Sequence, residues 1–111
     1  MSKYEDMSDF EINTTVAEIL GKVIQSPIKK GQQVVRVLSQ KLDGEVKDFN
    51  PCNNPSDAWP IIFENEIGIT HGSVMCSAVA LVNNEAIQVA CEPSEILRAA
   101  MIVFLMIKDA E

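Results

Sequence analysis

Three cysteines and one histidine are the residues of this chain that could support nucleophilic or metal chemistry. They are Cys52, Cys76, Cys91 and His71. A thiol becomes a nucleophile when a base such as histidine lies beside it in the fold, and the two need not be adjacent in sequence. Cys52 and His71 therefore define one hypothesis, a small cysteine-dependent enzyme. The signal is weak, because many small proteins contain one residue of each type.

The spacing of the other polar residues indicates no assembled catalytic or metal site. There is no Cys-x-x-Cys pair, and the 16 acidic residues are dispersed along the chain, whereas a metal site needs three or four clustered ligands. The five glycines stand singly and cannot build a phosphate-binding loop. We therefore predict no catalytic residue, no metal ligand and no cofactor.

The charge of the chain bears on its binding partners. Nine basic and 16 acidic residues give a formal net charge of -7, and Lys29 and Lys30 are the only adjacent basic pair. Nucleic-acid phosphates repel such a chain unless a basic patch overcomes the net field. We expect no direct nucleic-acid binding. The acidity can serve solubility, attract a basic patch on another protein, or imitate DNA.

Length and composition predict one cytoplasmic domain over residues 1–111. The longest uninterrupted apolar run, Ala99 to Ile107, has nine residues, whereas a bilayer needs about 20. The first eleven residues are acidic and lack the apolar core of a secretory signal. The odd number of cysteines does not suggest a disulfide framework, so we expect free thiols in a reducing cytosol and no contact with a membrane.

The first helix is predicted over residues 8–20. Ser8 and Glu11 have the spacing of a capping box, in which each side chain accepts a backbone N–H. Apolar residues follow at helical spacing, and Gly21 can close the helix in a left-handed conformation.

Two β-hairpins are expected in the middle of the chain. The first has strands in residues 32–42 and 45–49, joined by a two-residue turn at Asp43-Gly44. The second joins residues 72–82 to residues 85–91 through Asn83-Asn84, because asparagine tolerates the positive φ angles of a type I′ turn.

The second hairpin has two further consequences. Its register places Cys76 directly opposite Cys91, as either a redox pair or two buried small hydrophobic residues. Both of its faces are apolar, which predicts that helices cover the sheet on both sides.

The last helix is expected after Pro93, with Ser94 as its cap. Between Ile96 and Ile107 only Arg98 is not apolar. A helix that is apolar all round is buried, either inside the fold or in a subunit interface. We therefore expect either an internal helix or a homodimer formed through it.

Residues 50–65, "NPCNNPSDAWPIIFEN", contain three prolines and the only tryptophan. Asn54 and Pro55 suit a helix cap and first position. Pro60 lacks an N–H and favours a start near Asp57, because an earlier start at Asn54 would have to bend at Pro60. Helical spacing then predicts an apolar stripe against the sheet. The stripe comprises Trp59, Ile62, Phe63 and Ile67.

These elements predict an α+β fold in the order α-β-β-α-β-β-α. A central antiparallel sheet of two hairpins would lie between about three helices. The expected core comprises Phe10, Ile12, Val16, Leu20, Val35, Val37, Trp59, Ile62, Phe63, Val79, Leu81, Ile87, Val89, Leu97, Ala100, Met101 and Phe104.

Three blocks of the sequence carry a resemblance to a known family. They are "SDFEIN" at 8–13, "NPCNNPSDAWPIIFENEIGI" at 50–69 and "LRAAMIVFLM" at 97–106. With these blocks the chain resembles the NinX-like family of small proteins of lambdoid phages and prophages. The resemblance implies a phage or prophage origin and a cytoplasmic location in an infected bacterium. It implies no established activity, and so no catalytic residues.

The function that these observations favour is a non-enzymatic interaction with a host or phage protein. The candidate contact residues are Asn53, Asn54, Asp57, Trp59 and Arg98. Arg98 can either pack its stem and reach solvent or a carboxylate with its head, or anchor a partner's carboxylate. The alternatives are an acidic DNA mimic that blocks a nucleic-acid-binding host protein, and the cysteine-dependent enzyme.

Overall fold

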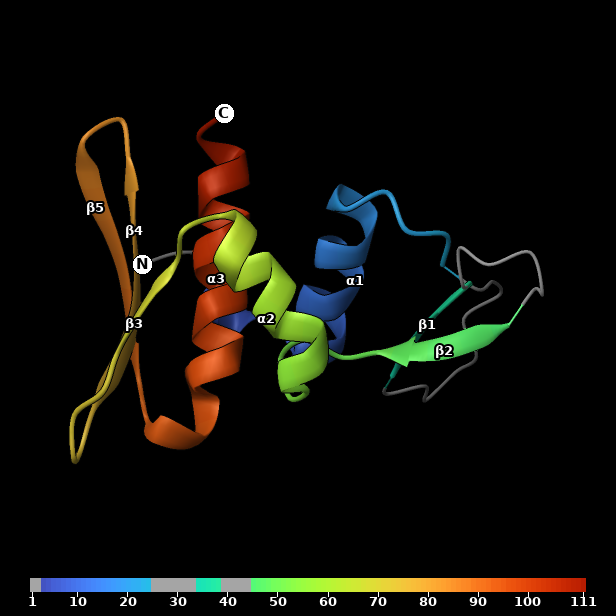
Figure 1. Cartoon of the computed structure of the whole chain (residues 1–111), viewed down its shortest axis with the longest axis horizontal. Coiled ribbons are helices and arrows are strands. Elements are labelled where there is room, and N and C mark those ends of the chain that lie inside the picture. Colours follow the sequence, from blue (N-terminus) through green and yellow to red (C-terminus); the bar gives the residue numbers. More distant parts are fainter. Residues whose placement is uncertain (1–2, 25–33, 39–44) are drawn as a thin grey trace.

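The computed structural model describes residues 3–24, 34–38 and 45–111. Within them the α-helices are α1 (Asp9–Ile19), α2 (Pro55–Glu64) and α3 (Ile96–Asp109), and the short 3-10 helices are η1 (Lys3–Asp6) and η2 (Pro93–Glu95). One antiparallel sheet holds β1 (Val35–Leu38) and β2 (Val46–Phe49), and a second holds β3 (Gly68–Thr70), β4 (Cys76–Val82) and β5 (Glu85–Cys91) (Figure 1). The α+β class and the predicted order are confirmed, and the short strand β3 extends the second hairpin.

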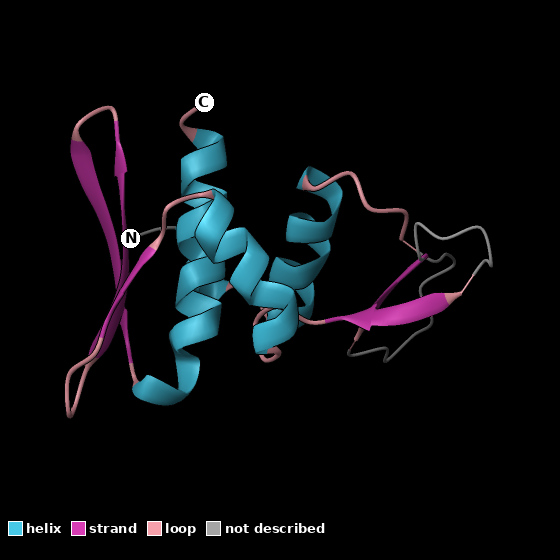
Figure 2. Ribbon diagram, in the orientation of Figure 1, coloured by secondary structure: helices cyan, strands magenta, loops and turns pink. Residues whose placement is uncertain are grey.

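Helix α3 forms the centre of the core. The second sheet packs on one side of it, and α1 and α2 pack on the other (Figure 2). Seven consecutive residues, from Ala99 to Leu105, are buried. The predicted burial of this helix is confirmed. Because its contacts lie within one chain, the apolar excess of α3 does not require a second copy to cover it.

The two ends of α1 have the local geometry that their residues predict. The Ser8 side chain accepts the Glu11 N–H, and the Glu11 carboxylate accepts the Ser8 N–H. At the other end Gly21 has a φ of 74°, and the Lys22 N–H returns to the Ala17 carbonyl. This is a Schellman closure. The capping box and the helix end are both confirmed.

The hairpin of β4 and β5 has the predicted register. Asn83 and Asn84 have φ angles of 54° and 67°, as a type I′ turn requires. Cys76 lies opposite Cys91, and both are free cysteines. The start of α3 differs from its prediction, since Ser94 lies in η2 and no side chain caps the helix at Glu95.

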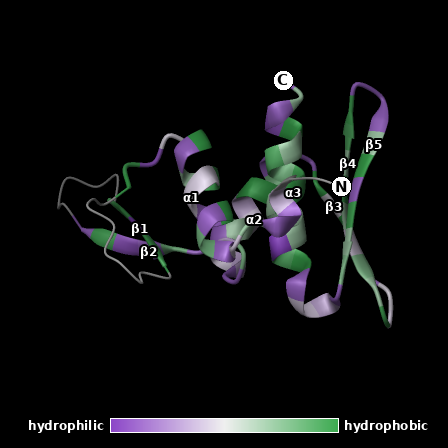
Figure 3. Ribbon diagram, turned by 180° about the vertical axis from the view of Figure 1, so that it is seen from behind, coloured by the Kyte–Doolittle hydropathy of each residue, from purple (hydrophilic) through white to green (hydrophobic). Residues whose placement is uncertain are grey.

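The strands form two sheets instead of one central sheet, and the second sheet is covered on one face. Helix α3 covers the face that carries Ala78, Ala80 and Val89, all buried. On the other face Leu81 is 75% exposed, and no described element lies beyond it in Figures 1 and 2. Strand β4 is apolar on both faces, as Figure 3 shows. The prediction that helices cover both faces of this sheet is nevertheless wrong for the described residues.

The hairpin of β1 and β2 is present with a different register from the expected one. A two-residue turn at Asp43-Gly44 would place residue 42 opposite residue 45, whereas Leu38 is paired with Val46. The pairing places Val35 opposite Phe49 on the buried side, so burial of these side chains outweighs the turn preference. The predicted turn itself, like the Lys29-Lys30 pair, lies outside the described residues.

Helix α2 begins earlier than predicted. Asn54 caps it by accepting the Ser56 N–H, and Pro55 takes the first position, so Pro60 stands inside the helix. The carbonyl that loses its N–H partner belongs to Ser56, which is exposed and can be hydrated. A start near Asp57 would avoid this loss, but the loss costs little at an exposed site.

Helix α2 buries only part of the predicted stripe, since Ile62 and, just beyond the helix, Ile67 are buried. Its buried residues are Ala58, Ile61 and Ile62, while Trp59 is 52% and Phe63 65% exposed. Two neighbouring apolar stripes satisfy the same helical period, and the packing against α3 selects the one with the small Ala58 at its centre.

Most of the predicted core is confirmed. Of the seventeen expected residues, four are exposed: Leu20, Trp59, Phe63 and Leu81. Another four are half-buried: Phe10, Val79, Ile87 and Leu97. The remaining nine are buried: Ile12, Val16, Val35, Val37, Ile62, Val89, Ala100, Met101 and Phe104.

Tyr4 connects the beginning of the described chain to its end. Its hydroxyl donates to the Asp109 carboxylate at the end of α3, and the residue is 7% exposed. Burial, together with the hydrogen bond to Asp109 and its charge, raises the pKa of Tyr4 from 10.0 to about 12. The folded state therefore binds the phenolic proton more tightly than the unfolded state.

This shift predicts how stability depends on pH in alkaline solution. Because the folded pKa of Tyr4 is the higher one, its contribution is complete below pH 10 and is lost as the pH rises towards about 12. Tyr4 is the only tyrosine, so ultraviolet titration of the native chain reports it alone. A native tyrosine pKa equal to that of the chain in denaturant would contradict the prediction. Tyr4→Phe should remove the loss of stability in this window.

Candidate functional site

The Arg98 guanidinium holds the N-terminal segment against α3. It donates to the Asp9 carboxylate over 2.7 Å, to the Met7 carbonyl over 2.6 Å and to the Glu5 carbonyl over 3.0 Å. Its side chain is 18% exposed. Of the two interpretations of Arg98, packing with the head on a carboxylate is the one that the structure shows, and the carboxylate belongs to the same chain.

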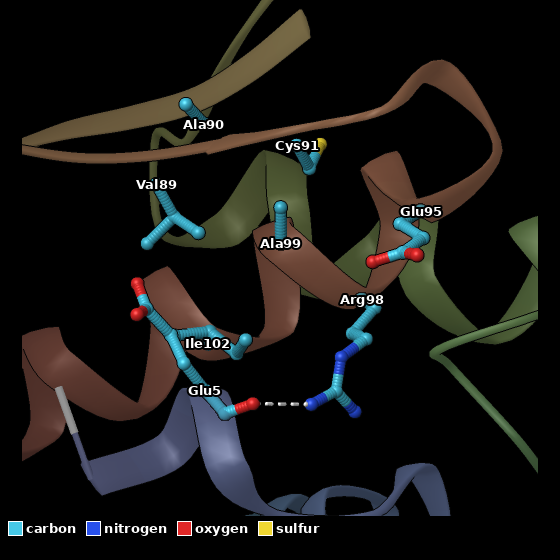
Figure 4. A pocket seen from close by; sticks show the side chains of 8 residues that line it. All are labelled: Glu5, Val89, Ala90, Cys91, Glu95, Arg98, Ala99 and Ile102. Carbon is cyan, nitrogen blue, oxygen red and sulfur yellow. Dashed lines mark hydrogen bonds between the residues drawn. The ribbon is translucent and has the colours of Figure 1, made fainter. Parts of the chain in front are cut away.

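A pocket of about 240 Å³ lies beside Arg98, between α3, β5 and η1. Figure 4 shows Arg98 extending from α3 to the Glu5 carbonyl, with Cys91 of β5 on the side of the pocket away from Glu5. The Glu5 and Glu95 carboxylates also line it. A guanidinium already bonded to three oxygen acceptors, next to two further carboxylates, gives little attraction to an anionic ligand. The pocket therefore lacks the features of an anion site.

The segment before α2 is tied to α1 by a buried amide. Asn13 is 1% exposed. Its side chain donates to the Asn50 side-chain oxygen over 2.7 Å and accepts the Cys52 backbone N–H over 3.1 Å. Both polar groups of the buried amide thus have partners, as a buried polar side chain requires.

Three of the predicted contact residues extend this network. The Asn53 side chain donates to the Asp9 carboxylate and to the Asn50 side-chain oxygen, each over 3.1 Å. Asp57 accepts the Asn50 backbone N–H over 2.9 Å, and Asn54 caps α2. The structure therefore brings Asn53, Asp57 and Arg98 together as internal ties. The roles of Asn53 and Asp57 were missed because the sequence does not show that Asn13, 40 residues away from Asn53, lies in the same network.

The aromatic pair on α2 is the exposed feature of this region. The Trp59 and Phe63 rings lie 4.9 Å apart between centroids and are perpendicular, an edge-to-face contact. Both side chains are more than half exposed. The sequence singled out Trp59 but assigned Phe63 to the core only. One turn of helix brings the two rings together.

The Cys52 thiol is a core group. It is 3% exposed, and burial raises its pKa to about 12, with the Asp9 carboxylate adding to the rise and the Arg98 guanidinium opposing it. Almost none of it is thiolate at neutral pH, whereas a catalytic cysteine needs the thiolate. The histidine lies beside another cysteine, since His71 Nδ1 is 3.7 Å from the Cys76 sulfur. Both findings weigh against the hypothesis of a Cys52 enzyme.

The other two cysteines lie on the covered face of the second sheet. Cys76 is 3% exposed and Cys91 is half-buried. Burial raises the pKa of Cys91, and the neighbouring Cys76 and Glu95 add to the rise. No group of three His, Cys, Asp or Glu side chains within residues 3–24, 34–38 and 45–111 is arranged to hold a metal ion.

These features define a small acidic α+β protein with a hydrogen-bonded interior and an exposed aromatic pair on α2. The chain belongs to the family described as Bacteriophage P22, NinX, which it matches over residues 3–108. It is thus a phage accessory protein. Neither the curated proteins nor the solved structures include a significant match to it. Within the described parts of the chain, no helix is long and apolar enough to span a bilayer.

Asn13→Ala tests the buried amide network. The substitution leaves the buried Cys52 N–H without its acceptor, so we expect the free energy of unfolding to fall by about 2–4 kcal/mol. Denaturant unfolding measures it. Thr15→Ala on the same helix is the matched control, because the Thr15 hydroxyl donates to the Glu11 carbonyl of its own helix and the residue is not fully buried. It should change stability by less than about 0.5 kcal/mol. Equal losses in the two variants would contradict the structural role of Asn13.

Alkylation at neutral pH tests the state of Cys52. In the native protein we expect the half-buried Cys91 to be modified before Cys52, because Cys52 is both covered and fully protonated. Mass spectrometry of peptides after timed exposure to iodoacetamide gives the order, and the denatured chain gives the rate for each accessible thiol. If Cys52 reacted first in the native protein, the argument against a Cys52 nucleophile would fail.

Proposed function

We propose that this phage protein is a non-enzymatic interaction module that binds a host or phage protein through the Trp59–Phe63 pair. The observation that carries the proposal is the exposure of both rings in one edge-to-face cluster. Large aromatic side chains in water forgo the free energy of burial, and tryptophan is the residue type most enriched at the energetic centres of protein interfaces.

The surroundings of the pair suggest the chemistry of the partner. Pro60, also exposed, adds rigid apolar surface to the same helix. Glu64 and Glu66 are exposed at the end of the helix and beyond it, and the whole chain carries a net charge of -7. The surface complementary to this one is an apolar pocket with a basic rim.

The helix that carries the aromatic pair is held in place within the fold. Helix α2 is capped at Asn54, packs Ala58, Ile61 and Ile62 inward, and is preceded by the network of Asn13 and Asn50. A contact surface held in place before binding loses less conformational entropy when the complex forms. In this proposal Asn53, Asn54, Asp57 and Arg98 position the surface and do not touch the partner.

The test is quantitative affinity capture from phage-infected cells with the doubly substituted chain Trp59→Ala/Phe63→Ala. We expect the specifically captured protein to fall at least about 10-fold, because losing two central aromatic contacts costs more than 1.4 kcal/mol. Since both side chains are exposed, folding should be preserved. Val74→Ala is the matched control, because Val74 is 75% exposed and lies just before β4, in the sheet on the other side of α3 from α2. It should capture as the native chain does.

The same experiment can contradict the proposal that the Trp59–Phe63 pair contacts the partner. Unchanged capture by the double variant would exclude the pair as the contact. Capture that survives the double substitution but disappears at high salt would favour the acidic surface, and with it the DNA-mimic alternative. Trp59 is the only tryptophan, so its fluorescence in the purified complex provides an independent readout of whether it becomes buried.

A further inference from the structure

The uncovered face of the second sheet is a second apolar surface, separate from α2. It is formed by alternate residues of β4 from Ser77 to Leu81, by alternate residues of β5 from Ala86 to Ala90, and by Gly68 and Thr70 of β3. We name it the outer sheet face. Val74 and Met75, just before β4, are 75% and 53% exposed and extend the apolar surface beyond the strand.

The outer sheet face carries no charged residue. Charged residues make up 23% of the chain, yet each outward position of these strands is small, apolar or an uncharged polar residue. Solvent-facing sheet positions ordinarily carry polar and charged side chains. An uncharged face of this kind is typical of a surface that is buried against another surface.

The polar side chains on this face already bond one another. The Thr70 and Ser77 hydroxyl oxygens are 2.6 Å apart, and the Gln88 side-chain N–H donates to the Ser77 hydroxyl over 3.0 Å. Groups that are paired within the sheet need fewer new partners when water is removed. The face can therefore be covered without requiring charged or complementary polar groups from its partner.

We infer that a second copy of this chain covers the outer sheet face, forming a dimer by face-to-face packing of two sheets. Two chains of charge -7 repel each other, and an interface free of carboxylates keeps that repulsion smallest. A basic heterologous partner would instead gain most on the acidic parts of the surface. In a twofold dimer the same surface of each copy contacts its counterpart, so the surface must be complementary to itself. An uncharged sheet face meets this requirement because it brings no like charges together.

The size of the face predicts the strength of the dimer. Strands β4 and β5 have seven residues each and β3 has three, so at about 3.4 Å per residue and about 4.8 Å between strands the face covers roughly 280 Å² on each copy. Even with the Val74 and Met75 side chains, two such faces do not exceed the low end of specific interfaces, about 1,200 Å² buried in total. The dimer should therefore dissociate on dilution. It replaces the homodimer expected through α3, whose apolar surface is covered within the chain.

Sedimentation equilibrium over a concentration series tests the inference. The native chain should show a reversible monomer–dimer equilibrium, and Leu81→Asp should raise the dissociation constant at least about 10-fold by placing two like charges in the interface. Trp59→Asp is the matched control, because it puts the same charge on another exposed apolar side chain, on α2, and should leave the equilibrium unchanged. This control also separates the dimer from the proposed partner site.

Three results would overturn the inference. They are a native chain that stays monomeric at the highest attainable concentration, a dimer that Leu81→Asp leaves intact, and a dimer that only Trp59→Asp dissociates. Should Leu81→Asp fail to fold, as circular dichroism would show, Ala86→Lys tests the same face from the exposed strand β5. An unchanged dimer in that variant contradicts the inference equally.

Discussion

The interior amide of Asn13 imposes the constraint on which the arrangement of the helices depends. A buried amide must find both a donor and an acceptor, and its partners come from Asn50 and the Cys52 backbone. Satisfying them fixes α1 against the segment that leads into α2. The same segment then reaches Asp9 through Asn53, and Asp9 reaches α3 through Arg98. Polar ties thus set the relative positions of all three helices, while apolar burial supplies most of the driving force.

This interior arrangement determines what the protein presents outside. With α2 held in place from its N-terminal side, its inward stripe is filled by Ala58, Ile61 and Ile62. Trp59 and Phe63 are left on the solvent side. On the opposite side of α3, one sheet face is used for the core and the other remains open. The two apolar surfaces of the protein therefore lie on different elements, with the central helix between them, and each can serve a different contact.

The polar residues that the sequence suggested as partner contacts form hydrogen bonds within the chain. Asn53, Asp57 and Arg98 all have intramolecular partners, and so a change at any of them would affect the stability of the fold. Cys52 is covered in the same way, and burial raises its pKa to about 12. The composition of the segment from Asn50 to Asn65 is therefore explained by the hydrogen bonds of its first residues to α1 and by the capping and packing of α2, which it contains. The exception is the exposed aromatic pair, which has no partner of this kind within the fold's core.

The sequence alone determined the helix caps and the turn, because each depends on contacts between residues a few positions apart. The Ser8–Glu11 box, the Gly21 closure and the Asn83-Asn84 turn each depend on contacts between near neighbours, and all three were predictable. The central burial of α3 followed from its composition alone. Tertiary packing decided which stripe of α2 faces inward, the register of β1 on β2, and the division of the strands into two sheets. Helical and strand periods admit more than one apolar face, and only the shape and polar partners of the neighbouring elements select between them.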